Sequence, residues 1–423
     1  GDEVMLLQLN AALGASATGY LAYLGKLPSS GAFWSNLSSE PNAVRAAGIV
    51  AGCSAAILSL RALEEMIYGG DQFSGKGPIG RTVDMIETFL DQEKKRKVVV
   101  NDWINEYNAL HKADDAEVRN TAYAKLVNAY YELATLFYEW GWGASFHFAY
   151  RMRGESFSEG IRRHEYYLST FLGGLKPKSK VLDVGCGIGG PYRNIARFTG
   201  WDVTGITLNE YQVQRGNQLA AAEGLGSQCR SVQGDFLAIP FPDSSFDGVY
   251  AIEATCHAPE RQKVYREIFR VLKPGQYFAC YEWCLTDKYD KNNSKHQWIK
   301  KRIEEGDGLP DIAFTGEVSK ALKDVGFEVM HERDMALDPN QAKPWYLPLC
   351  PSWNPFTQRF QFNWLGLILT KYMIKMMEWA YLAPKGTSKI QVMLQAGGMG
   401  CAQGGLTGTF TPMYLLVCRK PLK

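Results

Sequence analysis

The segment 181–191, with the sequence VLDVGCGIGGP, constrains the fold of this chain more than any other stretch. Its apolar first residues predict a short, buried parallel strand that ends near Asp183. The glycines that follow, including Gly185 and Gly187, predict a turn with so little side-chain bulk that backbone amides can approach a ligand. Pro191 suits the first turn of a following helix. We therefore expect a small molecule to bind at the carboxyl end of this strand, over a helix N-terminus, as in other open α/β sheets.

The glycines of this segment also satisfy the dinucleotide-binding fingerprint GxGxxG, which is a weak signal by itself. A dinucleotide site also needs an acid at the end of the second strand, to bind the ribose. Here the expected second strand, 202–206, is followed by the residues TLN, and no acid occurs before Glu210. The segment instead resembles the first motif, LDVGCGxG, of the S-adenosylmethionine methyltransferases of the doubly wound class.

Later features agree with this resemblance and occur in the expected order. The stretch GDFLAIPFPDSSFD places Asp235 and Phe236 after a third strand, and RVLKPGQYF forms a helix-turn-strand step. Strand patterns alternate with helical ones, which predicts an α/β fold with a doubly wound, seven-stranded, mostly parallel sheet. The expected strands are 180–184, 202–206, 230–233, 246–252, 276–283, 328–335 and 414–420.

Composition excludes some classes of function. The chain has 423 residues, 46% of them hydrophobic, which is enough for one large domain or two ordinary ones. The formal net charge is only +2, and no basic patch is interleaved with aromatic residues, so we expect no nucleic-acid partner. The nine cysteines form no CxxC pair, which favours reduced thiols in a cytosol-facing protein. The six histidines lack metal-ligand spacing, so we expect no metal.

Two uncharged runs lie near the N-terminus. As a helix, residues 4–25 would span about 33 Å, roughly a bilayer core, although polar residues dilute the run. The second run, 46–60, is too short to span a bilayer unaided. A membrane-attached hairpin and a soluble helical appendage both fit this pattern. The basic run KKRK at 94–97 fits either anionic lipid headgroups or a solvated face.

Two further stretches carry candidate chemistry. FYEWGWGASFHF, at 137–148, combines six aromatic residues with Glu139 and His147 on a backbone that contains two glycines. Packing in a core explains aromatic residues, but it does not easily explain a carboxylate and an imidazole beside them. IEATCHAP, at 252–259, places a Glu and a His at the end of the fourth strand, where they would face the same crevice. A capping Glu and an exposed His are the alternative interpretation.

Together with LDVGCGIGGP, these stretches resemble the sterol 24-C-methyltransferases. The resemblance also includes RRHEYY, YEW, GDGLPDI and FTPMY, and it extends from about residue 101 to residue 422. It implies transfer of the methyl group of S-adenosylmethionine to carbon 24 of a Δ24 sterol side chain. A carbocation would form, and a hydride shift and loss of a proton would give a 24-methylene or ethylidene sterol. Such a site must exclude water and stabilise positive charge, which aromatic faces can do without acting as nucleophiles.

The resemblance implies roles for individual residues. The candidate catalytic residues are Tyr138, Trp142, His147, Glu253 and His257, with the last three as alternatives for the base or for binding the sterol hydroxyl. The candidate substrate-binding residues are Glu139, Trp140, Phe146 and Glu165. The candidate cofactor-binding residues are Asp183, Gly185, Cys186, Gly187, Leu208, Gln212, Asp235, Phe236 and Glu253.

The resemblance also implies an organisation and a setting. We expect a helical, membrane-associated extension (1–95), a helical substrate-site segment (96–175), the cofactor-binding core (176–335) and a sterol-binding lid with the last strand (336–423). We expect a sterol substrate, a location at the cytosolic face of the endoplasmic reticulum membrane, and a homo-oligomer. Trp140 resembles enzymes of the second methyl addition and FTPMY those of the first, so first, second or both additions remain open. Another apolar acceptor, such as a fatty acyl chain or prenylated quinol, and a non-catalytic lipid-binding protein are the alternatives.

Overall fold

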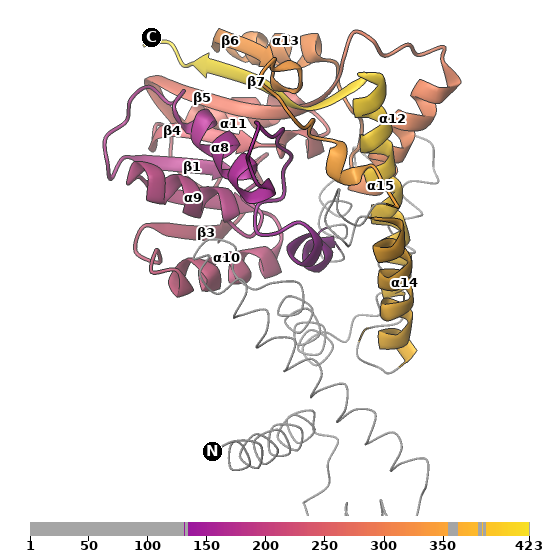
Figure 1. The fold of residues 1–423 in the computed structure, drawn as a ribbon. Helices are drawn as coiled ribbons and strands as arrows, with labels where there is room; N and C mark the ends of the chain where they lie inside the picture. The colour runs from indigo at the N-terminus through magenta and orange to yellow at the C-terminus, as the bar shows by residue number, and fades with distance from the viewer. Residues whose placement is uncertain (1–130, 132–133, 354–362, 380–382, 384–385, 423) are drawn as a thin grey trace, which may run out of the picture. The chain divides into compact units, whose positions relative to one another are not determined.

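The computed structural model describes residues 131, 134–353, 363–379, 383 and 386–422 (Figure 1). All of them belong to one compact unit, Ile86–Lys423. The two uncharged N-terminal runs and the basic run at 94–97 lie outside the described residues. The expected membrane-associated extension and the expected segment boundaries therefore stay predictions.

A seven-stranded sheet in the order β3-β2-β1-β4-β5-β7-β6 forms the centre of the fold. The strands are β1 (Lys180–Val184), β2 (Asp202–Thr207), β3 (Cys229–Gln233), β4 (Phe246–Ile252), β5 (Leu272–Leu285), β6 (Glu328–Asp334) and β7 (Phe410–Arg419). β7 runs antiparallel to both neighbours, and the other strand pairs are parallel. The predicted doubly wound, mostly parallel sheet is confirmed.

Two strands begin earlier than the sequence pattern predicts. β5 begins at Leu272, because this residue already pairs with Phe246 of β4 before the Lys-Pro-Gly turn residues. β7 begins at Phe410, although Pro412 argues against a strand interior. The ladder between β5 and β7 is irregular between Glu282 and Cys284, and this irregularity accommodates a residue without an N–H group.

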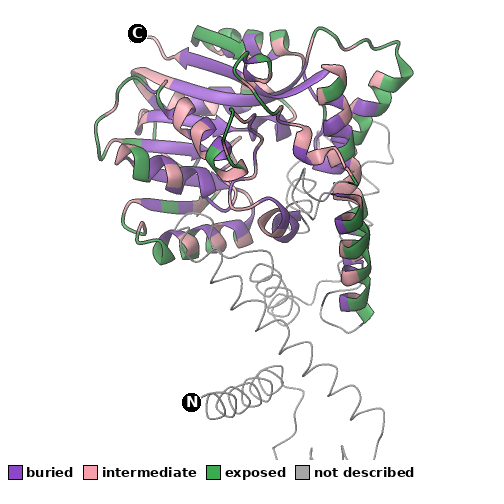
Figure 2. Cartoon of the chain, viewed as in Figure 1, coloured by how far each residue is buried: buried purple, intermediate pink, exposed green. Residues whose placement is uncertain are grey.

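Helices cover both faces of the sheet. Alternate strand residues point to opposite faces, and here both sets are apolar and need to be buried. Val181 and Tyr281 belong to one buried cluster, with residues of α8 (Phe157–Ser169), α9 (Gly190–Thr199) and α10 (Glu210–Ala222). Leu182 and Cys280 belong to a second cluster, with residues of α11 (Arg261–Val271) and α13 (Thr315–Val325). Both faces are therefore buried, as Figure 2 shows, which explains the continuous apolar runs in the strands.

Three further helices stand beside the carboxyl end of the sheet: α12 (Ser294–Asp307), α14 (Trp364–Trp379) and α15 (Thr387–Thr407). α12 and α15 pack closely where Gly306 faces Gly397. A Cβ atom added to Gly306 would lie 2.2 Å from the Cα atom of Gly397. Because only glycine permits this approach, these two residues fix the position of the end of α12.

Candidate active site

The turn between β1 and α9 forms the floor of the site. Gly185 and Gly187 have φ angles of 81° and 54°, a region that glycine enters readily. A Cβ atom on Gly185 would lie 2.3 Å from the Cβ atom of Ala254. The amides of Gly185 and Cys186 donate to the carbonyl of Ile206, at 2.9 and 3.0 Å. The turn is thus held close to both neighbouring strands.

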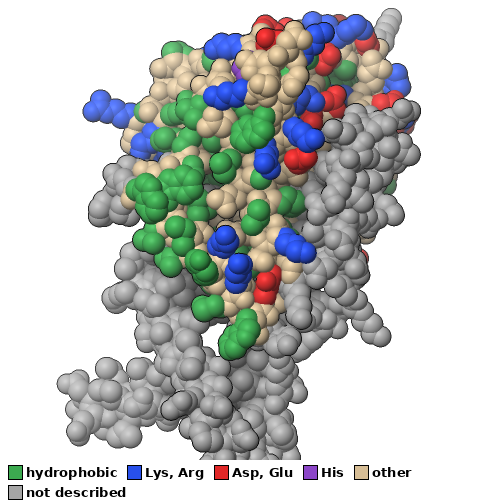
Figure 3. Space-filling view, turned by 90° about the vertical axis from the view of Figure 1, so that its right-hand side faces the viewer, with side chains coloured by type: hydrophobic (Ala, Val, Ile, Leu, Met, Phe, Trp, Pro, Cys, Tyr) green, Lys and Arg blue, Asp and Glu red, His purple; other side chains and the backbone are tan. Residues whose placement is uncertain are grey.

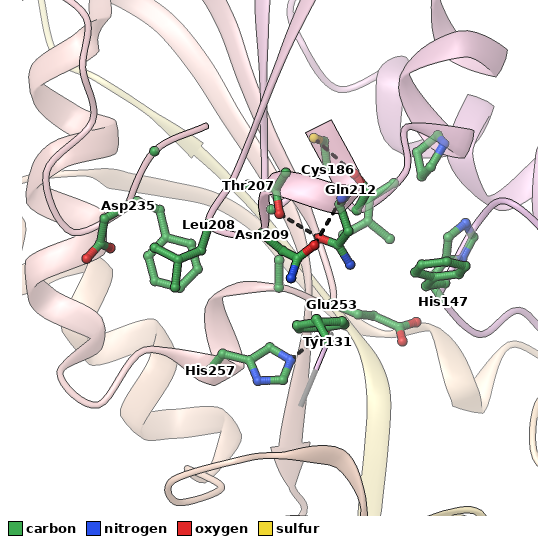
Figure 4. A pocket seen from close by; sticks show the side chains of 18 of the residues that line it. Tyr131, His147, Cys186, Thr207, Leu208, Asn209, Gln212, Asp235, Glu253 and His257 are labelled. Carbon is green, nitrogen blue, oxygen red and sulfur yellow. Dashed lines mark hydrogen bonds between the residues drawn. The ribbon is translucent and has the colours of Figure 1, made fainter. Parts of the chain in front are cut away.

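A pocket of ≈ 780 Å³ opens over this turn at the carboxyl ends of the strands (Figure 4). We call it the cofactor pocket. The predicted cofactor residues that line it are Gly185, Cys186, Gly187, Leu208, Gln212, Asp235, Phe236 and Glu253. Asp183 is not in the lining. It is buried beneath the turn, where it accepts a hydrogen bond from Tyr250 Oη at 3.1 Å. Burial raises the pKa of Asp183 to about 8, against the opposing effect of this bond.

Thr207 and Asn209 also line the cofactor pocket, although no motif in the sequence identified them. The hydroxyl of Thr207 donates to Gln212 Oε1 at 2.6 Å, and Asn209 caps α10 by accepting from the Gln212 amide at 3.0 Å. Gln212 Nε2 in turn donates to the hydroxyl of Thr135 at 3.1 Å. The preference for Asn at a helix N-cap is the sequence signal that could have identified Asn209.

A second pocket of ≈ 1110 Å³ lies next to the first and is lined mainly by apolar side chains. We call it the apolar pocket. Tyr138, Trp140 and Trp142 line it, as does Phe148. Trp142 is fixed there because its indole N–H donates to the carbonyl of His147 at 2.8 Å. Its ring also packs edge-on against Phe148 at 5.2 Å between centroids.

Phe146 and His147 line both pockets and therefore mark the junction between them. The ring of Phe146 lies 5.3 Å from that of Tyr138, and it would contact a Cβ atom on Gly187 at 3.4 Å. A ligand group over the glycine turn thus borders the same side chain as a ligand in the apolar pocket. This geometry suits group transfer from one pocket to the other.

His147 is held by two hydrogen-bond acceptors. Its Nε2 atom lies 3.0 Å from Glu165 Oε1, and its Nδ1 atom lies 3.0 Å from the carbonyl of Phe148. Although burial opposes the charged form, the bond to the Glu165 carboxylate raises the pKa of His147. Glu165 itself lies in neither pocket lining. It accepts further bonds from Ser145 Oγ at 2.6 Å and Asn194 Nδ2 at 2.8 Å, so its contact is with His147.

Glu139 also lies outside both pocket linings. Its carboxylate pairs with Arg215 of α10, whose Nε atom lies 3.0 Å from Oε1. The pair joins the aromatic segment, residues 137–148, to the cofactor-binding core across 76 residues of sequence.

Glu253 lies at the end of β4 with a φ angle of 52°, a strained value for a residue other than glycine. Its two carboxylate oxygens accept hydrogen bonds from the Phe148 amide at 2.8 Å and from Trp283 Nε1 at 2.7 Å. Burial raises the pKa of Glu253 to about 8, although both donors and His147 act in the opposite direction. Glu253 thus ties the aromatic segment to the sheet at the edge of the cofactor pocket.

His257 lines the cofactor pocket and bonds through both ring nitrogens. Its Nδ1 atom lies 3.2 Å from the carbonyl of Gly308, and its Nε2 atom lies 2.9 Å from Tyr131 Oη. A carbonyl can only accept, so Nδ1 carries the proton and Tyr131 donates to Nε2. Burial lowers the pKa of His257 to about 4, so the ring is neutral near pH 7.

Asp307 is a buried carboxylate in the apolar pocket, and it is not among the residues that the sequence predicted for the site. Its contacts are long: Tyr138 Oη donates at 3.4 Å and Cys401 Sγ at 3.6 Å. Burial raises the pKa of Asp307 to about 7, against the effect of both contacts. The motif GDGLPDI contains this residue, but nothing in its spacing indicates that α12 ends in the pocket.

Within the part of the chain that the structure describes, no cluster of three or more His, Cys, Asp or Glu is placed to hold a metal ion. Nor does any described helix combine the length and hydropathy of a membrane-spanning segment.

Solved structures share the fold. Geranyl diphosphate methyltransferase, in complex with GPP and sinefungin, aligns with a TM-score of 0.51 and 16% identity, covering 70% of this chain and 98% of that one. The [4+2]-cyclase SpnF aligns with a TM-score of 0.51 and 21% identity, covering 70% and 96%. At these identities the likeness supports the α/β architecture and not a particular reaction.

Sequence comparisons are more specific. The model of the methyltransferase domain matches residues 182–280, and that of the sterol methyltransferase C-terminal region matches residues 357–422. Cycloartenol-C-24-methyltransferase of Arabidopsis thaliana is 51% identical over 317 residues, 75% of this chain and 93% of that protein. Sterol 24-C-methyltransferase of Saccharomyces cerevisiae is 42% identical over 350 residues, 81% of this chain and 91% of that protein.

These relatives confirm the expected enzyme class, the expected S-adenosylmethionine cofactor and the expected sterol substrate. They give no support to a fatty acyl or quinol acceptor, or to a non-catalytic lipid-binding protein. The chain belongs to the sterol 24-C-methyltransferase family and is an enzyme that moves the methyl group of S-adenosylmethionine to carbon 24 of a sterol.

Proposed function

We propose that this enzyme methylates a Δ24 sterol of the cycloartenol type, with the sterol in the apolar pocket and the reaction at the junction of the two pockets. The shared lining of Phe146 and His147 carries this proposal, because it brings the contents of both pockets against the same side chains. Relatives from Arabidopsis thaliana and Oryza sativa, at 51% and 49% identity, are named for cycloartenol and support this acceptor.

The glycine turn fits the cofactor, because Gly185 and Gly187 line the cofactor pocket without a side chain that would occupy it. Leu208, Gln212 and Asp235 would hold it at the strand ends. When bound there, S-adenosylmethionine supplies an electrophilic methyl group. The protein must then align the sterol double bond with that group and exclude water.

The aromatic wall supports the positive charge that develops on the sterol side chain. Tyr138, Trp140 and Trp142 line the apolar pocket next to the junction. A ring face stabilises a nearby cation by about 0.5–2 kcal/mol, and it cannot trap a carbocation as water would. Three such faces therefore favour the transition state over the neutral sterol.

We propose Asp307 as the proton acceptor that ends the reaction. Both nitrogens of His147 already face acceptors, and both oxygens of Glu253 already accept short bonds in the cofactor pocket. Asp307 instead faces the apolar pocket with long contacts only. A carboxylate with a pKa of about 7 suits general-base catalysis near neutral pH.

The test is a product profile. The purified chain is incubated with methyl-labelled S-adenosylmethionine and cycloartenol, other Δ24 sterols, or a 24-methylene sterol, and the products are analysed by mass spectrometry. We expect one methyl group on cycloartenol and a 24-methylene product. Transfer to the 24-methylene sterol alone would contradict the proposed acceptor, and transfer to no sterol would contradict the proposed reaction.

We also propose that the enzyme works at the cytosolic face of the endoplasmic reticulum membrane, since a sterol acceptor resides in membranes. Fractionation of cells that produce the full chain tests this location. A homo-oligomer stays a prediction, which sedimentation of the detergent-free chain would test.

A further inference from the structure

α14 is apolar on two opposite sides. One side faces α15 and the interior: Gly366, Ile374 and Met377 are buried, and Leu367 and Thr370 line the apolar pocket. A helix packed on one side normally presents a polar stripe to solvent. α14 does not.

The opposite side of α14 carries large apolar side chains at three- and four-residue spacing, and we call it the outer stripe. It comprises Leu365 (49% exposed), Ile368 (42%), Leu369 (49%), Tyr372 (60%), Met376 (65%) and Trp379 (83%). Figure 3 shows hydrophobic side chains gathered on the face of the molecule that this helix forms. An exposed apolar patch of this kind marks an interaction surface.

The charges on α14 are arranged asymmetrically. Lys371 and Lys375 are exposed among the residues of the outer stripe. Glu378 is the one acid in the sequence of this helix, and it is turned toward the N-terminus of α15. Its carboxylate accepts hydrogen bonds from the amides of Gly386 at 3.0 Å and Ser388 at 2.7 Å. The outer stripe therefore presents apolar side chains together with positive charge.

We propose that the outer stripe of α14 inserts into the surface of a bilayer that carries anionic headgroups, and that the sterol enters the apolar pocket from this side. Apolar side chains interleaved with lysines, and an exposed Trp at the helix end, are typical of helices that lie in a membrane interface. Met399 of α15, the helix that packs against α14, lines the apolar pocket and is 40% exposed, and we therefore place the entry beside α14. This inference rests on the proposed sterol reaction and gives it a route of substrate entry.

A second copy of the chain suits this surface less well. A two-fold contact along the outer stripe would bring Lys371 and Lys375 of one copy near the same residues of the other. Glu378, whose carboxylate accepts from backbone amides at the N-terminus of α15, is not directed toward them. Anionic headgroups supply the missing negative charge.

The test uses a local probe in the full chain, so that binding by other parts of the chain does not mask the result. An environment-sensitive fluorophore is attached to Met376→Cys and, as a matched control, to Lys320→Cys on α13, with the labelled unsubstituted chain as background. Vesicles of phosphatidylcholine with and without phosphatidylserine are added. We expect a blue shift and a several-fold emission gain at position 376 with anionic vesicles, and no change at 320.

The double variant Lys371→Gln/Lys375→Gln tests the roles of the outer-stripe charge and of substrate entry. The double variant Lys320→Gln/Lys323→Gln on α13 is its control. We expect the first pair to weaken the response at position 376 to anionic vesicles about 30-fold. It should slow turnover of vesicle-borne sterol and leave turnover of detergent-dispersed sterol unchanged. A probe that stays in water, or one that shifts with protein concentration alone, would overturn the membrane inference. If the unsubstituted chain does not turn over detergent-dispersed sterol, the proposed sterol reaction would be overturned instead.

Discussion

Buried acids surround the junction of the two pockets, and they differ in what holds them. Burial raises the pKa of Glu253 to about 8 and that of Asp307 to about 7. Glu253 accepts two short N–H bonds and connects the aromatic segment to the sheet. Asp307 has only long contacts to a phenol and a thiol. A carboxylate that accepts only weak hydrogen bonds from the protein is better suited to accept a proton from a substrate.

Asp307→Asn removes the proposed proton acceptor and keeps its shape. We expect kcat to fall at least 100-fold with sterol KM within a few-fold, since general-base catalysis contributes about 10²–10⁴. The unsubstituted enzyme should gain kcat as pH rises through about 7, because Asp307 must be ionised to act. Asp307→Glu should retain part of the activity and of this pH dependence. A raised KM at unchanged kcat would show instead that Asp307 binds the sterol hydroxyl.

Glu165→Gln tests the pair that holds His147. The carboxylate accepts from His147, Ser145 and Asn194, whereas an amide would direct its own N–H₂ group at one of these donors. We expect the variant to lose about 2–4 kcal/mol of unfolding free energy in urea, because a buried pair is broken and a donor is left unpaired. The pKa of His147 measured by NMR should fall.

The matched control for this pair is Glu328→Gln, which removes an exposed ion pair with Arg419. It should change the unfolding free energy by less than about 1 kcal/mol. Equal losses in the two variants would contradict a special role for Glu165.

At the scale of elements, the aromatic segment 137–148 is an ordered wall because its neighbours hold it at several points. Trp142 bonds to the His147 carbonyl within the segment, and Glu253 of the β4 end holds the Phe148 amide. Glu139 pairs with Arg215 of α10. These contacts keep the rings facing the apolar pocket. A site that stabilises a cation and excludes water requires this arrangement.

Trp142→Leu should therefore lower kcat far more than it lowers affinity for the cofactor. Loss of one aromatic face predicts a decrease in kcat of up to about 30-fold, with the cofactor Kd unchanged. Trp142→Phe keeps a ring but loses the bond to the His147 carbonyl, so its kcat should be intermediate. Single-turnover kinetics and cofactor titration measure the two effects, and thermal melts check folding. Parallel losses in kcat and cofactor affinity would argue against the role in cation stabilisation.

At the scale of the whole molecule, local patterns predicted what they encode directly. Apolar runs and the glycine turn predicted the sheet and the cofactor pocket, since both depend on contiguous residues. The aromatic residues of 137–148 were predicted to line a pocket, and Tyr138, Trp140 and Trp142 do so. Their roles in charge stabilisation stay predictions.

What the sequence did not reveal depends on contacts between distant segments. Asp307 reaches the apolar pocket because Gly306 packs against Gly397 of α15, which is far along the chain. Glu139 and Glu165 are charged residues in promising motifs, yet Arg215 and His147 engage them away from the pockets. No local spacing encodes these partners, because tertiary packing chooses them.

Asp183 gives the chain a pH-dependent stability that belongs to the whole fold. Burial raises its pKa to about 8, far above the ordinary value that applies in the unfolded chain. Its favourable contribution to the free energy of unfolding is therefore fully present below pH 4 and is lost as pH rises to about 8.

Asp183→Asn removes this titration and keeps an acceptor for Tyr250. Melting temperatures of the cofactor-free chain should show the variant gaining stability relative to the unsubstituted chain between pH 5 and pH 8. Asp287→Asn, at an exposed position, should show no such trend. A constant difference between the Asp183 variant and the unsubstituted chain across this range would mean that Asp183 is ionised in the folded state.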